Sequence, residues 1–345
     1  MSKRSPLTWT LAPERANSIA SEWLGEVSTT EALYGEYDKN FLVRTGGSRR
    51  SVLKVTADAS EATRSLVEFQ VAILSHLANA GLETRTPVPI PSASGELWQT
   101  IQDDDGSDHL AWMLSYVDGR LLDDESNYSP ALLDSIGRAV GEVDAALSSA
   151  PTQGADRELE WDLQRTLDAK PLTEHIPAGP RRDVALASFE VFESETAPAL
   201  AELPRSVIHN DGGNQHNMLL AESGPPRVCG IIDFGDAVLT PTICGLGIAC
   251  AYAAFGTAEP IDALSAVSRA YFDVLERERE HALLVPRLAA ARLTISVSMA
   301  AKRSVTHGDD PYANVSADGA WRVLEALHRW NSVDQERFLE LCDER

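Results

Sequence analysis

Hydrophobic positions in the first third of the chain change repeatedly between the spacing of helices and that of strands. Residues 8–27 have apolar side chains on one side of a short helix, and residues 58–80 repeat them every three or four positions. The apolar runs typical of strands are 29–43, 51–55, 97–101 and 110–117. A Gly-Gly turn and a DDDGSD turn between such runs predict two hairpins. The pattern therefore indicates a small α+β lobe.

Helical spacing dominates the rest of the chain. A polar connector over 117–130 precedes a clear amphipathic helix over 131–147. Further helices are predicted over 159–167, 181–203, 243–256, 260–279, 282–305, 317–328 and 334–342. We therefore predict a two-lobed α+β fold, with a small β-rich N-terminal lobe over 1–117 and a larger, mainly helical lobe over 118–345.

The exception in the second lobe is the stretch 206–240, where short apolar runs alternate with turns. Such runs predict short buried strands, and they place Asp211 and Asp233 at strand ends or in loops, with Asn217 between them in the sequence. Phosphoryl transfer requires an acid and an amide that hold Mg²⁺ through oxygens, and a second acid that orients a hydroxyl. Each motif alone is also typical of an ordinary turn. Their combination favours a phosphotransferase.

Lys54 stands alone among apolar residues in the predicted strand SVLKV. A lysine that points inward from such a strand can bind the phosphates of ATP, whereas a lysine on the solvent face of an edge strand is the alternative. A phosphate-binding lysine usually has an acidic partner on the neighbouring helix. Glu68 fits by its charge, and Gln70 fits the helical spacing better. The backbone at Ser115 and Tyr116, just before the connector, can bind an adenine edge.

The net charge indicates which partners this protein can bind, and the cysteines indicate its redox environment. The 345 residues include 30 Lys and Arg against 52 Asp and Glu, a net charge of −22. Such a surface repels nucleic acid and anionic membranes. It can attract cationic small molecules, or the charge can serve solubility alone. Four cysteines without zinc-site spacing favour reduced thiols. With no secretory signal and no membrane-length apolar run evident, we expect a cytoplasmic protein.

The motifs resemble those of the aminoglycoside phosphotransferase and choline kinase superfamily, small-molecule relatives of the protein kinases. IHNDGGNQHNMLL resembles the catalytic loop of that family, GIIDFGD its metal-binding segment, SVLKV its nucleotide lysine, and MLSYVDGRLL its hinge and connector. The stretches EYDKNFLV, ELEWDL and IIDFGDAVLTPTICGLGIACAYA are most similar to those of hydroxylysine kinases and of kinase domains fused to class III aminotransferases. The resemblance implies a protein-kinase-like fold.

The resemblance also implies residue roles. Asp211 would be the catalytic base, Asn217 and Asp233 the Mg²⁺ ligands, and Lys54 the residue that binds the α- and β-phosphates of ATP. Asp211 and Asn217 are six residues apart where the family usually has five, so that one glycine of Gly212-Gly213 resembles an insertion. Asn214 and Gln215 are therefore alternative ligands.

These features predict an ATP- and Mg²⁺-dependent kinase that phosphorylates a hydroxyl of a small, amine-bearing molecule such as a hydroxyamino acid. A cationic or zwitterionic acceptor needs a carboxylate for its ammonium group and a cation for its carboxylate. Asp236 and Arg292 are the candidates, followed by Trp161 and Tyr312. An antibiotic phosphotransferase, favoured by the acidic charge, and a pseudokinase that binds nucleotide without chemistry are the alternatives. The sequence is compatible with a homodimer but does not determine the oligomeric state.

Overall fold

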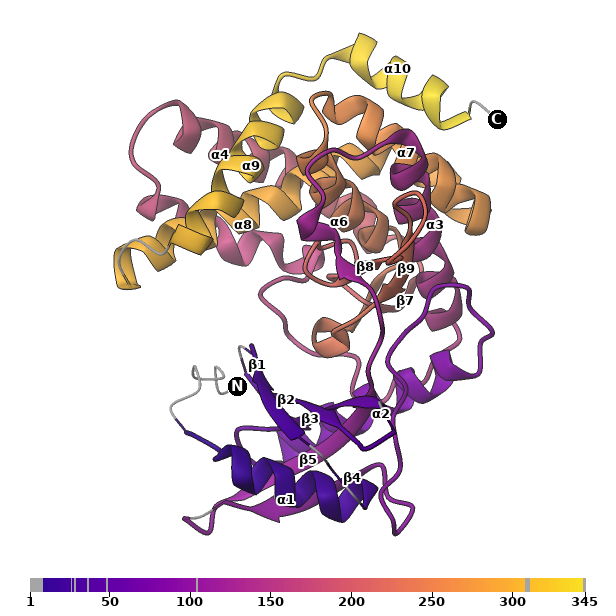
Figure 1. The fold of residues 1–345 in the computed structure, drawn as a ribbon. Coiled ribbons are helices and arrows are strands. Elements are labelled where there is room, and N and C mark those ends of the chain that lie inside the picture. Colours follow the sequence, from indigo (N-terminus) through magenta and orange to yellow (C-terminus); the bar gives the residue numbers. More distant parts are fainter. Residues whose placement is uncertain are drawn as a thin grey trace. The chain divides into compact units, whose positions relative to one another are not determined.

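The computed structural model describes residues 9–25, 27, 29–35, 37–47, 49–103, 105–307 and 311–343, except for the side chains of residues 307 and 311–316. The chain divides into two compact units (Figure 1). Unit 1 comprises Met1–Gly81 and Thr86–Val117, and unit 2 comprises Leu82–Arg85 and Asp118–Arg345. Unit 1 is built on an antiparallel sheet and unit 2 is mainly helical. The predicted two-lobed α+β fold is confirmed.

Unit 1 contains a five-stranded sheet in the order β1-β2-β3-β5-β4. The strands are β1 (Thr29–Leu33), β2 (Lys39–Arg44), β3 (Arg50–Val55), β4 (Trp98–Gln102) and β5 (Asp108–Ser115), and the helices are α1 (Pro13–Leu24) and α2 (Glu61–Ala78). Both predicted hairpins are found, because β2 pairs with β3 and β4 pairs with β5, each antiparallel.

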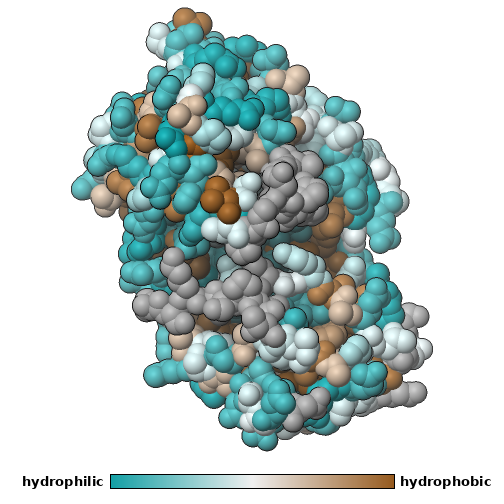
Figure 2. Space-filling view, turned by 90° about the vertical axis from the view of Figure 1, so that its left-hand side faces the viewer, coloured by the Kyte–Doolittle hydropathy of each residue, from teal (hydrophilic) through white to brown (hydrophobic). Residues whose placement is uncertain are grey.

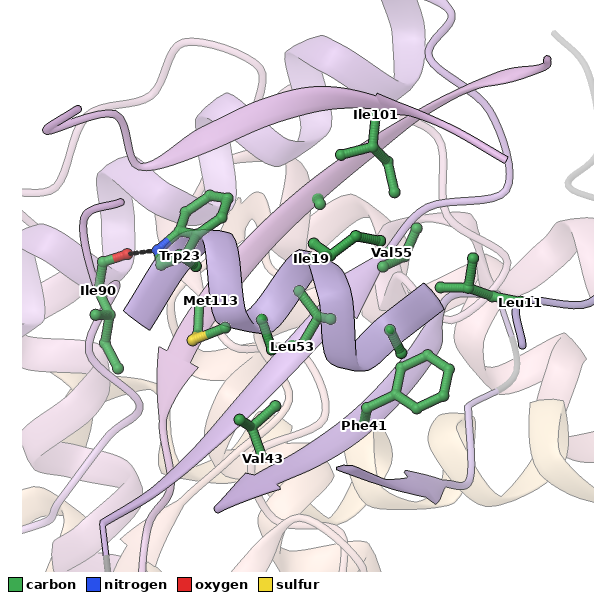
Figure 3. Packing of buried hydrophobic residues seen from close by; sticks show 13 residues of the cluster. Leu11, Ile19, Trp23, Phe41, Val43, Leu53, Val55, Ile90, Ile101 and Met113 are labelled. Atoms are coloured by element: carbon green, nitrogen blue, oxygen red, sulfur yellow. Dashed lines mark hydrogen bonds between the residues drawn. The ribbon is translucent and has the colours of Figure 1, made fainter. Parts of the chain in front are cut away.

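Helix α1 packs against one face of this sheet. Burial alternates along β3, which turns Leu53 and Val55 into the core and places Lys54 on the opposite face. Ile19 and Trp23 of α1 meet the buried face (Figure 3). The indole N–H of Trp23 donates to the carbonyl oxygen of Ile90 at 2.9 Å, so the polar group of this buried ring is satisfied.

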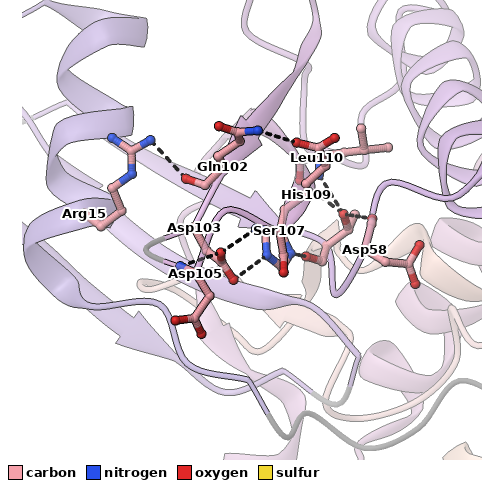
Figure 4. Close-up of polar contacts among 10 residues, drawn as sticks. Arg15, Asp58, Gln102, Asp103, Asp105, Ser107, His109 and Leu110 are labelled. Atoms are coloured by element: carbon pink, nitrogen blue, oxygen red, sulfur yellow. Dashed lines mark hydrogen bonds and ion pairs between the residues drawn. The ribbon is translucent and has the colours of Figure 1, made fainter.

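A polar network fastens the turn between β4 and β5 (Figure 4). Asp103 Oδ1 accepts hydrogen bonds from the backbone N–H groups of Asp105 and Ser107 at 3.0 and 2.8 Å. Its Oδ2 lies 3.0 Å from Nε2 of the buried His109, whose Nδ1 lies 2.9 Å from the Thr56 carbonyl oxygen. Both ring nitrogens of His109 therefore lie within hydrogen-bond distance of an oxygen.

Unit 2 combines helices with two small antiparallel sheets. The α-helices are α3 (Pro130–Leu147), α4 (Pro180–Val191), α5 (Ala197–Ala201), α6 (Ile243–Ala253), α7 (Pro260–Val274), α8 (Val285–His307), α9 (Pro311–His328) and α10 (Ser332–Asp343). The strands are β6 (Arg120–Leu121), β7 (Arg205–Ile208), β8 (Met218–Leu220), β9 (Val228–Ile231) and β10 (Val238–Pro241). One sheet pairs β7 with β10, and the other has the order β6-β8-β9. The short strands expected within 206–240 are found, with β10 as an additional one.

Several helices differ from the prediction in their bounds or type. The segment expected as a helix over 159–167 is instead the 3-10 helix η2 (Leu163–His175), in which Pro171 and a non-helical Arg165 interrupt regular α-helix geometry. Helix α7 ends at Val274, and the 3-10 helix η6 (Glu276–Leu284) joins it to α8. The predicted helix over 181–203 is observed as α4 and α5 with a π-helical segment between them.

The segment Leu82–Arg85 belongs to unit 2, although the sequence placed it in the first lobe. The backbone N–H of Arg85 donates to the Cys229 carbonyl oxygen at 3.0 Å, and Ile231 N–H donates to the Arg85 carbonyl oxygen at 2.9 Å. Its guanidinium donates to the Asp118 carbonyl oxygen at 2.6 Å. These contacts extend the edge of β9, so the chain enters unit 2 briefly before it completes unit 1.

One helical stretch, Glu276–Thr306, is long and apolar enough to cross a membrane, with a mean hydropathy of 1.4. However, 67% of its apolar window is buried inside the protein, as in a core helix. It packs against α6, α9 and η2, which accounts for its composition. The face of the molecule drawn in Figure 2 is mainly hydrophilic, with hydrophobic residues scattered over it.

Candidate active site

The loop over 209–217, between β7 and β8, carries Asp211, the predicted catalytic base. Asn210 turns the chain with a φ of 64°, and Asp211 follows with a side chain that is 14% exposed. The Nδ2 atoms of Asn214 and Asn217 donate to Asp211 Oδ2 at 3.0 and 2.8 Å. The loop therefore folds back on its own acid and fixes one of its two oxygens.

The glycine pair accommodates the extra residue of this loop. A Cβ atom at Gly213 would lie 2.3 Å from Cα of Ala249 in α6, a distance that a real side chain does not reach. The loop can therefore lie directly against α6. Asn217 still reaches Asp211, although the two are six residues apart.

The two alternative amides are engaged elsewhere. Asn214 Oδ1 accepts a hydrogen bond from the His216 backbone N–H at 3.1 Å. Gln215 Nε2 donates to Asp123 in the connector at 2.6 Å. Asn214 and Asn217 both donate to Asp211, but the amide oxygen of Asn214 already accepts from the His216 amide, and Gln215 is turned toward the connector.

Asp233 lies directly after β9, in the left-handed region with φ 64° and ψ 73°. Strands β8 and β9 are antiparallel, with Met218 opposite Ile231, and Ile232 N–H donates to the Asn217 carbonyl oxygen at 2.9 Å. The register therefore brings Asn217 and Asp233 to neighbouring positions. Because the Asn217 amide nitrogen faces Asp211, its amide oxygen is directed away from that acid.

A carboxylate and an amide oxygen fit Mg²⁺, which typically keeps several waters and takes one or two carboxylates plus substrate phosphates. The described residues contain no group of three or more His, Cys, Asp or Glu that could hold a metal ion by itself. This donor set suits a metal that arrives with a nucleotide, and not a permanent all-protein site.

His209 contacts both the loop that carries Asp211 and the end of β9 before Asp233. Its Nε2 lies 3.0 Å from the carbonyl oxygen of Ile232, and its Nδ1 accepts from the Asp211 backbone N–H at 3.3 Å. The ring also packs against Phe234, with 4.3 Å between the ring centroids. Burial lowers the pKa of His209, which keeps the ring neutral and fits an acceptor at Nδ1. The sequence prediction did not include this residue in the site.

Arg292 of α8 is the cationic partner of Asp211. One guanidinium nitrogen lies 2.5 Å from Asp211 Oδ1, and the side chain is 2% exposed. The guanidinium lies over the rings of Trp161 and Tyr252, 4.7 and 5.5 Å from their centroids, and donates to the Trp161 carbonyl oxygen at 3.0 Å and to the Tyr252 hydroxyl. We expected Arg292 to bind an acceptor carboxylate. Instead its guanidinium is buried against the Asp211 carboxylate and beside the Trp161 ring.

Burial of several acids together perturbs their pKa values. Desolvation raises the pKa of Asp211 to about 7; Arg292 opposes this shift, while Asp236 and Asp233 add to it. The pKa of Asp236 is also raised, mainly by burial and then by Asp233, with Arg157 acting against the shift. Asp236 therefore lies in the same electrostatic cluster as Asp211. Perturbed acids of this kind are typical of functional sites.

The predicted nucleotide residues lie in unit 1. Lys54 Nζ is 3.9 Å from Asp38 Oδ2 and 5.5 Å from the centroid of the Trp112 ring. Glu68, the partner that the sequence favoured, is exposed on α2, whereas Gln70 is buried. An acid that does lie beside Lys54 is Asp38, which precedes β2. Helical spacing cannot indicate this contact, because Asp38 lies before a strand and not on α2.

The backbone at Ser115 and Tyr116 is already partly engaged. Ser115 N–H donates to the Val88 carbonyl oxygen at 2.8 Å, and Tyr116 N–H donates to the Arg50 carbonyl oxygen at 3.3 Å. An adenine edge at this position would therefore have to hydrogen-bond to the carbonyl oxygens of these residues or to a neighbouring backbone N–H. The side chain of Tyr312 lies outside the described residues.

In this two-lobed α+β fold, Asn217 contacts Asp211 within one loop and lies opposite the residue before Asp233, an arrangement that fits a kinase-like phosphotransferase. The model of the phosphotransferase enzyme family matches residues 29–283. The chain belongs to this family, and the predicted enzyme class is confirmed at the level of the family.

Two curated relatives are similar in sequence. A hydroxylysine kinase of Danio rerio is 25% identical over 234 residues, which are 65% of this chain and 65% of the relative. A hydroxylysine kinase of Xenopus laevis is 22% identical over 312 residues, covering 84% and 82% of the two chains. The chain thus spans about two thirds of the first relative's length.

Solved structures share the fold. A structure of an amicoumacin kinase in complex with AMP-PNP, Ca²⁺ and Ami has a TM-score of 0.64 at 13% identity. The similarity covers 91% of this chain and 93% of that one. At this identity the likeness concerns the fold alone.

Proposed function

We propose that this protein transfers the γ-phosphoryl group of ATP to a hydroxyl of a small, amine-bearing molecule, with a hydroxyamino acid such as hydroxylysine as the acceptor class. The observation that carries the proposal is the position of Asp211, whose carboxylate is held at both oxygens by Arg292, Asn214 and Asn217. The similarity to two hydroxylysine kinases supports the acceptor class.

In the proposed reaction the acceptor oxygen forms a bond to the γ-phosphorus while the bond to the β-γ bridging oxygen breaks. ADP leaves, and the acceptor becomes a phosphate monoester. Asp211 orients the acceptor hydroxyl and takes its proton, which then passes to solvent. The transition state is loose, so positioning of the hydroxyl supplies more of the acceleration than base strength does.

Asn217 and Asp233 would hold Mg²⁺, which neutralises charge on the β- and γ-phosphates when bound. Lys54 would contribute a further positive charge to the nucleotide phosphates. Asp236 is the proposed partner for the ammonium group of the acceptor, because it is a partly buried carboxylate within the field of Asp211. The proposal leaves the cation for an acceptor carboxylate unassigned, since Arg292 is occupied by Asp211.

An antibiotic phosphotransferase is the second candidate. The net charge of −22 favours a polycationic acceptor, and one solved structure of the same fold is an amicoumacin kinase. A site that offers the Asp236 carboxylate to an ammonium group fits such a molecule as well as it fits an amino alcohol.

A coupled ADP-release assay with mass analysis of the products tests the proposal. Hydroxylysine is compared with lysine, which carries the same charges but lacks the hydroxyl, and with ethanolamine and kanamycin. Turnover of hydroxylysine but not of lysine, with addition of one phosphate, is the expected result. Turnover of kanamycin alone would favour the second candidate. Binding of Mg·ATP with no turnover of any acceptor would contradict the proposal and favour a nucleotide-binding module.

A further inference from the structure

The guanidinium of Arg292 contacts the predicted catalytic base along only part of its edge. An arginine frequently binds a carboxylate through two parallel hydrogen bonds. Here Arg292 donates one bond to Asp211, from Nη2 to Oδ1 at 2.5 Å. The other carboxylate oxygen, Oδ2, accepts from the amide groups of Asn214 and Asn217 instead. A single bond leaves the plane of a guanidinium free to turn, so a further contact is needed to fix it.

Tyr252 of α6 supplies that contact. Its hydroxyl oxygen accepts from Nε of Arg292 at 3.3 Å and from Nη2 at 3.2 Å. These two nitrogens form one edge of the guanidinium, so the hydroxyl stands where the second oxygen of a carboxylate often lies. Burial raises the pKa of Tyr252, while the nearby charge of Arg292 opposes this shift. The hydroxyl therefore keeps its proton at neutral pH and accepts as an uncharged group.

Other contacts complete the surroundings of Arg292. Nη1 donates to the Trp161 carbonyl oxygen at 3.0 Å. The acceptors thus come from three parts of unit 2, namely α6, the segment before η2 and the loop after β7. The Tyr252 ring has an edge contact with Phe255, with 5.6 Å between the ring centroids. Because the Arg292 side chain is only 2% exposed, solvent water does not readily replace a lost acceptor.

We propose that Tyr252 is a positioning residue for phosphoryl transfer, whose hydroxyl holds the Arg292 guanidinium in the plane from which Nη2 reaches Asp211 Oδ1. In the described part of the chain no hydrogen bond joins this hydroxyl to Asp211 itself, so Tyr252 acts through the arginine. The inference rests on the proposed function in so far as Asp211 is the catalytic base. Displacements of about 1 Å at a reacting group reduce rates by about 100-fold, so a turn of the guanidinium should lower kcat.

Solvent exchange of the Arg292 Nε–H hydrogen, followed by NMR, tests the contact without reference to activity. In Tyr252→Phe we expect this hydrogen to exchange about tenfold faster or more, because its acceptor is removed while the ring stays in place. Tyr271→Phe is the matched control, since it removes the hydroxyl of another buried tyrosine, which donates to Asp144 at 3.1 Å. Exchange at Arg292 should stay unchanged in that variant.

Steady-state kinetics with ATP and hydroxylysine test the consequence. Tyr252→Phe should lower kcat by about 3- to 30-fold and keep both KM values within about twofold of wild type, because the hydroxyl aligns the base and binds neither substrate. Tyr271→Phe should keep the wild-type kcat even where its melting temperature falls. A higher KM for hydroxylysine at unchanged kcat in Tyr252→Phe would overturn the proposal, since the hydroxyl would then contact the acceptor.

A double-mutant cycle separates action through Arg292 from a general effect on the fold. The kcat values of Tyr252→Phe, Arg292→Met and the double variant are compared with that of wild type. Tyr252→Phe should cause no further loss of kcat once Arg292 is replaced. Losses that multiply in the double variant would contradict the proposed route. If Arg292→Met does not fold, the exchange of Nε–H and the kcat of Tyr252→Phe decide.

Unchanged exchange of the Arg292 Nε–H hydrogen in Tyr252→Phe would overturn the proposal, and so would a wild-type kcat in that variant. A wild-type protein that phosphorylates no acceptor would contradict the proposed function instead. The exchange measurement would still report whether Tyr252 holds Arg292.

Discussion

Two ion pairs, one in each unit, differ sharply in geometry. In unit 2 the Arg292 guanidinium lies 2.5 Å from Asp211, is 2% exposed and is enclosed by aromatic rings. In unit 1 the Lys54 ammonium lies 3.9 Å from Asp38, and both side chains retain 12 to 14% exposure. Arginine makes planar, fixed hydrogen bonds, while lysine carries a compact charge on a flexible stem. The comparison indicates that Arg292 supports Asp211 permanently, whereas Lys54 can exchange its contact with Asp38 for a contact with a ligand.

Removal of Arg292 should have the largest effect. Arg292→Met leaves the Asp211 carboxylate buried without its cation, which typically costs about 3–5 kcal/mol of unfolding free energy. We also expect kcat to fall by about 100-fold or more, because the orientation of Asp211 is lost. Chemical denaturation and steady-state kinetics measure both quantities.

Arg287→Met, on the same helix, is the control. Arg287 pairs with Glu195 at 2.6 Å, but its side chain is 37% exposed, so its loss should cost about 0–1 kcal/mol. Equal stability and activity of the two variants would mean that the buried pair does not support Asp211.

Replacement of Lys54 should act on nucleotide affinity and leave the fold largely intact. Lys54→Met is expected to weaken binding of the ATP analogue AMP-PNP by about tenfold or more, since a charge on the phosphates is lost. Asp38→Asn should leave affinity unchanged or increase it, because Asp38 and the phosphates attract the same ammonium. Calorimetric titration measures these affinities, with Lys39→Met on the adjacent strand as the control. Weaker binding in Asp38→Asn would show that the pair itself is part of the nucleotide site.

The contiguous parts of the fold and of the site were predictable from the sequence. Apolar spacing located both hairpins and the long helices, because each element's own periodicity is independent of its neighbours. The neighbourhood of Asp211, Asn217 and Asp233 was also indicated, since one short loop holds the first two and the β8–β9 pair places Asn217 opposite the residue before Asp233. The interrupted helix η2 was not, because Pro171 and the non-helical Arg165 break the helix within a mainly polar segment.

Contacts between distant segments were not predictable. Arg292 is 81 residues from Asp211, and its spacing in α8 indicates only a helical face. The contact of Asp38 with Lys54 was not predictable either, because Asp38 lies before β2 and not on α2, where helical spacing points. The close packing of Asp144 against Gly245 was likewise not predictable, because the helical spacing within α3 does not indicate which residue of α6 faces it.

The smallest predicted effect concerns pH and the β4–β5 turn of unit 1. Contact with His109 and backbone amides lowers the pKa of Asp103 below its ordinary value of 3.8. A carboxyl with a lowered folded-state pKa stabilises the fold above its unfolded pKa, and that contribution is lost as the pH falls through the folded value. Asp103→Asn should therefore melt slightly below wild type at pH 6, and the difference should close below about pH 4. A constant difference across this range would exclude the charge of Asp103 as its cause.

Comparison of Asp211→Asn with wild type is the most direct test of the phosphoryl-transfer centre. The substitution keeps the size of the side chain and its contacts with Arg292 while it removes the proton acceptor. We predict that kcat with the acceptor that the screen identifies falls by about 100- to 10,000-fold, while Mg·ATP still binds with an affinity near that of wild type. Near-normal turnover by Asp211→Asn would contradict the assignment of Asp211 as the catalytic base.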